Sequence, residues 1–221
     1  MAKTSANIHP SAIVHPDALI GEGVSIGAFS IIGKSSLEPN SIIHSHVVIG
    51  DGVAIGPRVE VFPGAFIGKE PKGAGALART PEFERAITIG EECSIGPNSV
   101  IYYDVTIGNN TLIGDAASIR EKCRVGDRCI ISRCVTVNYA TTIGTGTKIM
   151  DNSHITGNAV IGSNVFISTM VGTTNDNLVR HGYSDHVVGP IIEDEVVIGV
   201  GASLLPAIRI ERGATVAAGS V

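Results

Sequence analysis

Aliphatic residues recur at every sixth position along most of the chain. A six-residue period fits neither an amphipathic helix, with a period of about 3.6, nor a plain alternating strand, with a period of about 2. It predicts a stacked repeat in which each six-residue unit forms one short strand and one corner. In the central block the repeated position is held in turn by Ile89, Ile95, Ile101, Ile107, Ile113, Ile119, Val125, Ile131, Val137, Ile143, Ile149, Ile155, Ile161 and Ile167.

The same period reaches towards both ends of the chain. Three units complete one triangular turn, so residues 18 apart stack on each other. The thirty units predict about ten triangular coils of an all-β, parallel β-helix that forms a single domain over residues 1–221. The outer units carry Ile8, Val14, Ile20, Ile26 and Ile32, then, after a one-residue shortening, Leu37, Ile43, Ile49, Ile55, Val61 and Ile67, and finally Ile192, Ile198, Leu204, Ile210 and Val216.

Composition agrees with a thin prism. The chain has 27 Gly and no Trp, which suits tight corners with little room for rings. Glycine follows the aliphatic residue in half of the central units, as in Ile95-Gly96 and Ile113-Gly114. We attribute these glycines to corners that demand a backbone conformation other residues resist.

Charge and cysteine content limit the cellular setting. A net charge of -5 provides no basic stripe for nucleic acid, and no signal peptide, lipidation motif or long apolar span is found. A cytoplasmic protein with neither nucleic acid nor membrane as a partner is expected. Cys93, Cys123 and Cys129 occupy the small inward position of their units and only Cys134 does not, so we expect structural thiols and no metal.

Two segments, 69–86 and 172–190, break the period and are predicted to be loops extruded from the prism. Loops on a rigid scaffold commonly carry function. The second concentrates side chains that can recognise a polar substrate: Asn175, Asp176, Arg180, His181, Tyr183, Asp185 and His186.

His154 is the candidate catalytic residue. It precedes the inward Ile155 and therefore faces outward, and residue 172, where the second loop begins, stacks one coil above it. By strand alternation, Asn152 is expected on the same outward face. An imidazole, an amide and a polar loop can deprotonate and position an amine or a hydroxyl, although a surface histidine without a role is the alternative.

The chain resembles the hexapeptide-repeat acyltransferases, which implies that the β-helix is left-handed. IHPSAIVHPDALIGEGVSIGAFSIIG at 8–33, HSHVVIG at 44–50 and MDNSHITGNAVIG at 150–162 are similar to the UDP-N-acetylglucosamine O-acyltransferases. That family carries its catalytic base in a His-x-x-His motif. Here the first histidine is His154, but the second position is Gly157, a departure from the motif on which transfer to a hydroxyl depends.

The second half instead resembles the coenzyme-A-dependent N-acetyltransferases of nucleotide-linked amino sugars. The similar segments are NSHITGNAVIGSNVFIS at 152–168, TTNDN at 173–177 and the run from Gly189 to Val221. The resemblance implies acetyl-coenzyme A as co-substrate, a homotrimer with sites between subunits, and a role in lipopolysaccharide or other cell-surface polysaccharide biosynthesis. It puts the loop residues Asn175, Asp176, Arg180, His181 and Tyr183 near the sugar and the small residues Gly201, Ala202, Ala217 and Ala218 along coenzyme A.

The resulting hypothesis is direct transfer of an acyl group to a sugar amine. His154 accepts the amine proton, Asn152 orients the reactants, and backbone N–H groups of the adjacent coil hold the thioester oxygen. Three alternatives remain open: an O-acyltransferase that uses acyl-carrier protein and a UDP-sugar, a γ-class zinc carbonic anhydrase with His181 and His186 as ligands, and a non-catalytic scaffold.

Overall fold

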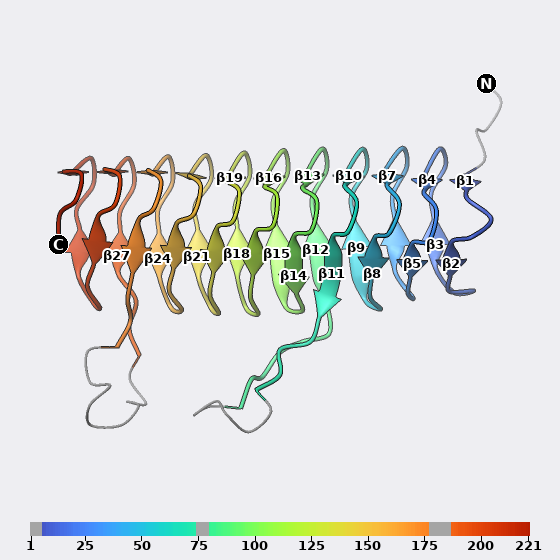
Figure 1. Cartoon of the computed structure of the whole chain (residues 1–221), viewed down its shortest axis with the longest axis horizontal. Helices are drawn as coiled ribbons and strands as arrows, with labels where there is room; N and C mark the ends of the chain where they lie inside the picture. The colour runs from blue at the N-terminus through green and yellow to red at the C-terminus, as the bar shows by residue number, and fades with distance from the viewer. Residues whose placement is uncertain (1–5, 74–79, 177–186) are drawn as a thin grey trace.

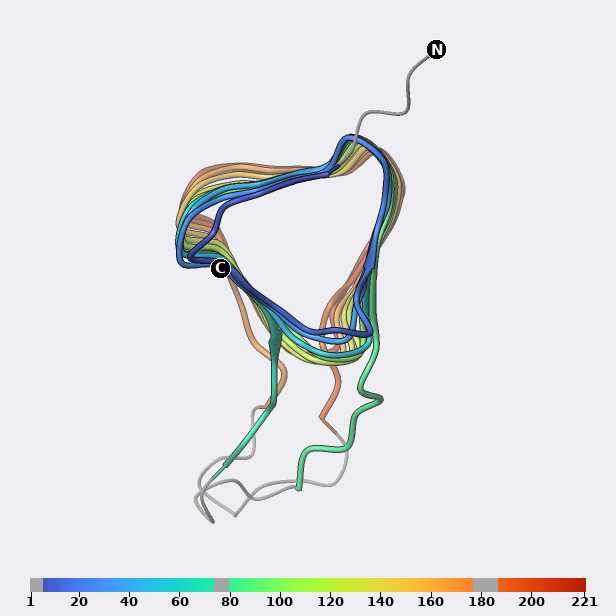
Figure 2. The ribbon, with the colours of Figure 1, turned by 90° about the vertical axis from the view of Figure 1, so that its right-hand side faces the viewer.

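The computed structural model describes residues 6–73, 80–176 and 187–221, and within them it contains short parallel strands and no helix. The strands form three long sheets, in which each strand pairs with the strands three before and three after it. Viewed along the axis, the coils superimpose as a triangle, and from the side they stack as a straight prism (Figures 1 and 2). The predicted fold, a left-handed parallel β-helix of about ten triangular coils, is confirmed.

The strands are two to four residues long. The first sheet contains β1 (Asn7–Ile8), β4 (Ser25–Ile26), β7 (Ile42–Ile43), β10 (Glu60–Val61), β13 (Ser94–Ile95), β16 (Leu112–Ile113), β19 (Ile130–Ile131), β22 (Lys148–Ile149), β25 (Phe166–Ile167), β28 (Val197–Ile198) and β31 (Thr215–Val216). The second contains β2 (Ile13–Val14), β5 (Ile31–Ile32), β8 (Val48–Ile49), β11 (Phe66–Lys69), β14 (Val100–Tyr102), β17 (Ser118–Ile119), β20 (Thr136–Val137), β23 (His154–Ile155), β26 (Gly172–Thr173) and β29 (Ser203–Leu204). The third contains β3 (Leu19–Ile20), β6 (Ser36–Leu37), β9 (Val53–Ile55), β12 (Ile87–Ile89), β15 (Val105–Ile107), β18 (Arg124–Val125), β21 (Thr142–Ile143), β24 (Val160–Ile161), β27 (Ile191–Ile192) and β30 (Arg209–Ile210).

The predicted inward residues form the core. Ile95 pairs with Ile113 in the ladder and both are fully buried, as is Ile131 in the next coil. Burial of such a side chain contributes about 1.5–3 kcal/mol relative to exposure. The one-residue shortening appears as a 17-residue step, because Leu19 pairs with Ser36.

Several polar residues at the small inward position find an acceptor in the next coil, whereas the buried Ser99 hydroxyl has no hydrogen-bond partner among the described residues. The Thr111 hydroxyl donates to the Gly126 carbonyl at 2.9 Å, and the Thr147 hydroxyl donates to the Gly162 carbonyl at 2.8 Å. The Ser153 hydroxyl does the same with the Ser168 carbonyl at 2.8 Å. A recurring hydrogen bond between coils thus satisfies groups whose burial is otherwise costly.

The reason proposed above for the glycines is wrong. Left-handed backbone recurs at the corners, but at residues such as Asn98 (φ 56°) and Asn110 (φ 56°), two positions after the glycine in each case. A Cβ on Gly96 would instead lie 2.7 Å from the carbonyl carbon of Gly114. These glycines are needed because the backbone of the next coil approaches closely.

The two loops leave the prism at the same edge, between the second and third sheets (Figure 2). β11 ends at Lys69 and β12 begins at Ile87, close to the predicted limits. The second loop begins slightly later than predicted, because Gly172 and Thr173 still form β26 and pair within the second sheet.

The cysteines give a simple test of the coil register. Cys93, Cys123 and Cys129 are buried and Cys134 is exposed, as predicted. Burial raises the pKa of Cys123 to about 12. Since the thiolate is the nucleophile, we expect a maleimide at pH 7 to modify Cys134 alone in the folded protein and all four thiols in denaturant, measured by mass spectrometry of peptides. Comparable labelling of Cys123 in the folded state would show that the register is wrong.

No described segment of the chain forms a helix with the length and apolarity needed to cross a bilayer.

Candidate functional site

His154 lies on the outward face of β23 in the second sheet. Its Nδ1 is 2.7 Å from Oγ1 of Thr136, the residue stacked one coil below, and it pairs in the ladder with Gly172 one coil above. The predicted stacking of residue 172 on His154 is therefore confirmed, although residue 172 belongs to β26 and the loop begins after it. If Nδ1 carries the hydrogen and donates it to Thr136, the lone pair of Nε2 is left free to act as a base.

Partial burial lowers the pKa of His154, because desolvation disfavours the imidazolium. A lowered pKa keeps the ring neutral around pH 7. The side chain is therefore in the protonation state that a general base requires.

Asn152 lies in the turn before β23 rather than on the strand. Its backbone is left-handed (φ 60°), and its N–H donates to the Arg133 carbonyl at 3.0 Å. Strand alternation therefore does not apply to it, since alternation requires extended backbone. Its role as a catalytic residue stays a prediction that rests on the sequence alone.

Three residues after His154, Gly157 stands where the His-x-x-His motif has its second histidine. An aromatic ring occupies the space beside it that a side chain would need. A Cβ on Gly157 would lie 2.5 Å from Cε2 and 2.6 Å from Cζ of Tyr139, the residue one coil below. One coil above, the Asn175 side chain donates to the Gly157 carbonyl at 3.0 Å, and its Nδ2 is 3.4 Å from the Tyr139 hydroxyl oxygen. Tyr139, Gly157 and Asn175, here called the corner stack, bind the beginning of the second loop to two coils.

A charged pair continues this edge towards the first loop. The Arg120 guanidinium lies 5.7 Å from the ring centroids of both Tyr139 and Tyr102. It also donates two hydrogen bonds of 3.1 Å to Glu121, whose side chain is fully buried. No motif in the sequence marks these residues or Tyr139, although arranging the chain in rows of 18 places Tyr139, Gly157 and Asn175 in one column.

The end of the second loop is also held to the prism. The Asn158 side chain donates to the Val187 carbonyl at 2.7 Å. Asn175 and Asp176 lie at the beginning of this loop, whereas Arg180, His181 and Tyr183 lie outside the described residues, as does His186. Across 6–73, 80–176 and 187–221, no group of three or more His, Cys, Asp or Glu side chains is arranged to hold a metal ion.

The four residues expected along coenzyme A differ in accessibility. Gly201 (φ 67°) lies in the same column of left-handed corner residues as Asn152. Ala217 and Ala218 are exposed in the last coil. Ala202, in contrast, is fully buried in the core. Its side chain faces inward from the small position of its unit, so it cannot line a trough outside the prism.

Two of the candidate oxyanion donors are already used by the ladder. In the coil above His154, the N–H of Gly172 donates to the Ala202 carbonyl at 3.0 Å and that of Thr174 donates to the Leu204 carbonyl at 3.0 Å. These backbone groups are not free to bind a thioester oxygen.

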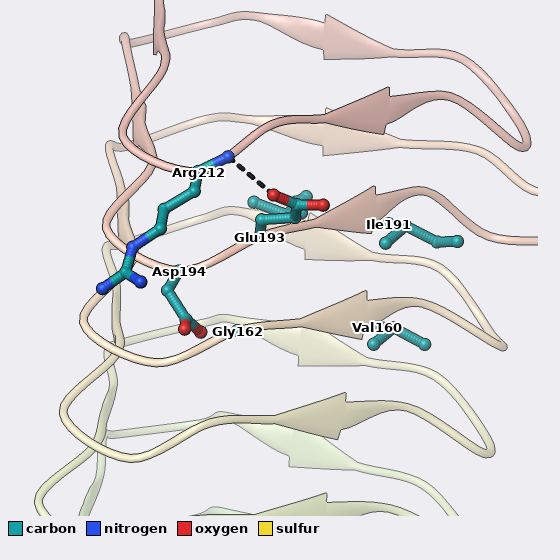
Figure 3. A pocket seen from close by; sticks show the side chains of 7 residues that line it. Val160, Gly162, Ile191, Glu193, Asp194 and Arg212 are labelled. Atoms are coloured by element: carbon teal, nitrogen blue, oxygen red, sulfur yellow. Dashed lines mark hydrogen bonds between the residues drawn. The ribbon is translucent and has the colours of Figure 1, made fainter.

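A cavity of about 200 Å³ lies on a different face of the prism (Figure 3). Val160 and Ile191 of the third sheet form one side, and Glu193, Asp194 and Arg212 form the corner beside it. The backbone N–H of Arg212 donates to the Glu193 carboxylate at 2.8 Å. The cavity is not on the sheet that carries His154.

Comparisons with known proteins agree with this architecture. Residues 83–182 match the family model described as the GMPPB C-terminal domain, and residues 190–221 match that of the hexapeptide repeat of succinyl-transferase. The solved UDP-N-acetylglucosamine acyltransferase of Arabidopsis is similar to the chain (TM-score 0.68, 21% identity, covering 95% of this chain and 70% of that chain). No curated protein sequence matches the chain.

Two bacterial structures are also similar. For the UDP-N-acetylglucosamine acyltransferase of Bacteroides fragilis the TM-score is 0.60 at 25% identity, with 92% of this chain and 71% of that chain covered. For the UDP-N-acetylglucosamine O-acyltransferase of Moraxella catarrhalis the TM-score is 0.54 at 24% identity, with 80% and 79% covered. The predicted resemblance to the hexapeptide-repeat acyltransferases is confirmed.

Proposed function

We propose that this hexapeptide-repeat chain, an acyltransferase by its resemblance, transfers an acyl group from acyl-coenzyme A to the amino group of a nucleotide-linked amino sugar. The observation that carries the proposal is the geometry at two positions: Thr136 holds Nδ1 of His154, and the Tyr139 ring occupies the space that a side chain at position 157 would need. The proposal includes acetyl as the acyl group, a homotrimer and a place in cell-surface polysaccharide biosynthesis, as the resemblance implies, and a cytoplasmic location, as expected from the sequence.

The chemistry of an amine fits one histidine better than the chemistry of a hydroxyl does. An amine is already nucleophilic when unprotonated, so a base needs only to remove its proton after attack has begun. A sugar hydroxyl is a weaker nucleophile and requires the base to remove its proton as the new bond forms. Burial lowers the pKa of His154 and makes the ring a weaker base, which is enough for the acidic N–H of the amine adduct but less suited to a sugar hydroxyl.

In the proposed reaction the amine nitrogen attacks the thioester carbonyl and forms a tetrahedral intermediate. Nε2 of His154 takes one proton from the nitrogen, with Nδ1 held by Thr136 at 2.7 Å. The C–S bond then breaks, and the leaving thiolate receives the proton from the imidazolium. The products are an amide and free coenzyme A, and no acyl-enzyme is formed.

The second candidate is an O-acyltransferase that uses acyl-carrier protein. It is favoured by the similar structures, which are named as UDP-N-acetylglucosamine acyltransferases. Against it stands the corner stack, in which the position that completes His-x-x-His has no room even for a Cβ unless the Tyr139 ring moves.

Release of coenzyme A from acetyl-coenzyme A distinguishes the two candidates. We expect a thiol reagent to detect turnover with one or more UDP- or dTDP-linked amino sugars and none with the matched hydroxyl sugars. Turnover only with an acyl-carrier protein as donor and a hydroxyl sugar as acceptor would contradict the proposal. If all donors and acceptors fail, the chain is better described as a scaffold.

A further inference from the structure

A second cavity, of about 500 Å³, lies on the second sheet where the first loop leaves the prism. Its floor contains Ile31, Val48 and Phe66, which are neighbours across β5, β8 and β11. Ile31 is 46% exposed and Phe66 is 36% exposed, so the floor is an apolar stripe open to solvent. Strands lie about 4.8 Å apart, so the three side chains form a stripe about 10 Å long, parallel to the prism axis.

The backbone beside this floor is distorted to admit a buried phenol. The ladder between β11 and β14 shifts register between Ile67 and Lys69, and Gly68 adopts φ 103°. Tyr103, only 2% exposed, lines the cavity, and its hydroxyl oxygen would lie 2.5 Å from a Cβ on Gly50. Bulges of this kind often re-aim a side chain next to a functional site.

Cationic side chains of the first loop border the cavity. Lys69, Lys72 and Arg85 line it together with two carboxylates, Glu70 and Asp51, which leaves one positive charge in excess. Glu70 is shared, because it pairs with Lys72 at 3.4 Å and also with Arg85. A ligand anion can therefore take one of these two cations without leaving Glu70 unpaired.

Asp51 and Arg85 lie in adjacent coils beside the cavity, as the pairing of Val53 with Ile87 shows. One carboxylate oxygen of Asp51 accepts from the Lys34 N–H at 2.7 Å, on the side away from the first loop. The Arg85 guanidinium lies 5.3 Å from the Tyr103 ring centroid, so a cation and a phenol meet in the lining of the cavity. Burial raises the pKa of Tyr103, which keeps its hydroxyl a neutral donor.

We propose that this cavity binds a linear aliphatic carboxylate. The carboxylate lies at the Arg85 and Lys72 end, within the region that the Tyr103 hydroxyl lines, and the alkyl chain follows Phe66, Val48 and Ile31. A narrow stripe one side chain wide suits an extended chain better than a flat ring system. The site is distinct from His154, since four ladder steps from β11 to β23 amount to about 19 Å. It does not depend on the proposed function.

Isothermal titration of the full chain with sodium butyrate, octanoate and decanoate tests this site. We expect saturable one-to-one binding of decanoate, several-fold weaker binding of octanoate and no measurable binding of butyrate, because each buried methylene adds to affinity. Decylamine has the same chain with the opposite charge and is expected not to bind. Equal binding of decanoate and decylamine would show adsorption to apolar surface only and would overturn the proposal.

Three substitutions locate the ligand. Arg85→Gln and Lys72→Gln are each expected to weaken decanoate binding about tenfold, since each removes a charge-assisted hydrogen bond. Tyr103→Phe keeps the ring and is expected to weaken binding a few-fold. Lys72 is 79% exposed, so its variant should fold even if the other two do not.

Arg212→Gln is the matched control, because Arg212 also pairs with an exposed glutamate, Glu195, at 2.7 Å, on another edge of the prism. It should bind decanoate like the wild type. No saturable binding of decanoate by the wild type, or undiminished binding by Lys72→Gln, would refute the site. If decanoate binding is lost as the protein concentration rises and the chain self-associates, a second copy of the chain covers the stripe instead, which would also overturn the proposal.

Discussion

His154→Asn is expected to lower kcat/KM for the amino-sugar acceptor by about 10²–10⁴-fold, the usual contribution of a positioned general base. Asparagine can still hydrogen-bond to Thr136, but it cannot take the proton of the attacking amine. The measurement is steady-state release of coenzyme A at saturating acyl donor. His46→Asn is the matched control, because His46 is outward and its ring stacks on Phe29 at 5.2 Å, in the N-terminal part of the prism. A His154→Asn enzyme within a few-fold of the wild type would remove His154 from the mechanism.

The pH dependence of the same reaction follows from the lowered pKa of His154. The protonated ring cannot act as a base, so activity is lost as the pH falls through that pKa. Because the pKa is below the ordinary value of about 6.5, this loss is expected at lower pH than for a free imidazole. In His154→Asn the histidine-dependent loss should disappear, while the dependence on the substrate amine remains. An unchanged acid limb in the variant would contradict the assignment.

Gly157→Ala is expected to cost about 1–3 kcal/mol of unfolding free energy, the usual range for overpacking. The added Cβ would lie 2.5 Å from the Tyr139 ring, so the ring or the coil must move. Gly157→His, which restores the sequence His-x-x-His, places a larger side chain in the same space. We expect it to lose at least tenfold in kcat/KM, because a side chain there displaces Tyr139 and with it Asn175, which donates to the Gly157 carbonyl. No gain of O-acyl transfer is expected.

Gly172→Ala is the control for stability, since nothing lies within 4 Å of a Cβ built there. It should unfold at nearly the wild-type denaturant midpoint. The double variant Tyr139→Ala/Gly157→Ala should be destabilised by less than the sum of its two single variants, because removing the ring removes the clash. If the two losses of stability add strictly, the Tyr139 ring is not what makes a side chain at position 157 unfavourable.

The coil architecture could be predicted because one physical rule, burial of an aliphatic residue at every sixth position, repeats along the chain. The rule fixes which residues stack, and it correctly placed residue 172 on His154, which pairs with Gly172. It does not describe the corners. Asn152 was misplaced on a strand because alternation ends where the backbone becomes left-handed.

Side-chain contacts at the corners were also out of reach of the periodic pattern. Ala202 was expected along coenzyme A from the resemblance, yet it occupies the small position of its unit, which faces the core. Tyr139 was missed because nothing in its local sequence indicates a function. Its importance comes from what lies 18 and 36 residues later, Gly157 and Asn175, and so from the coil geometry rather than from a motif.

The most direct test of amine acylation is the chemical nature of the product. After incubation of the chain with acetyl-coenzyme A and the acceptor that supports turnover, the product is treated with mild base and its mass is measured before and after. The account predicts an acetylated nucleotide sugar that keeps its added acetyl group, because an amide resists this treatment. Loss of the acetyl group would identify an ester and contradict N-acyl transfer.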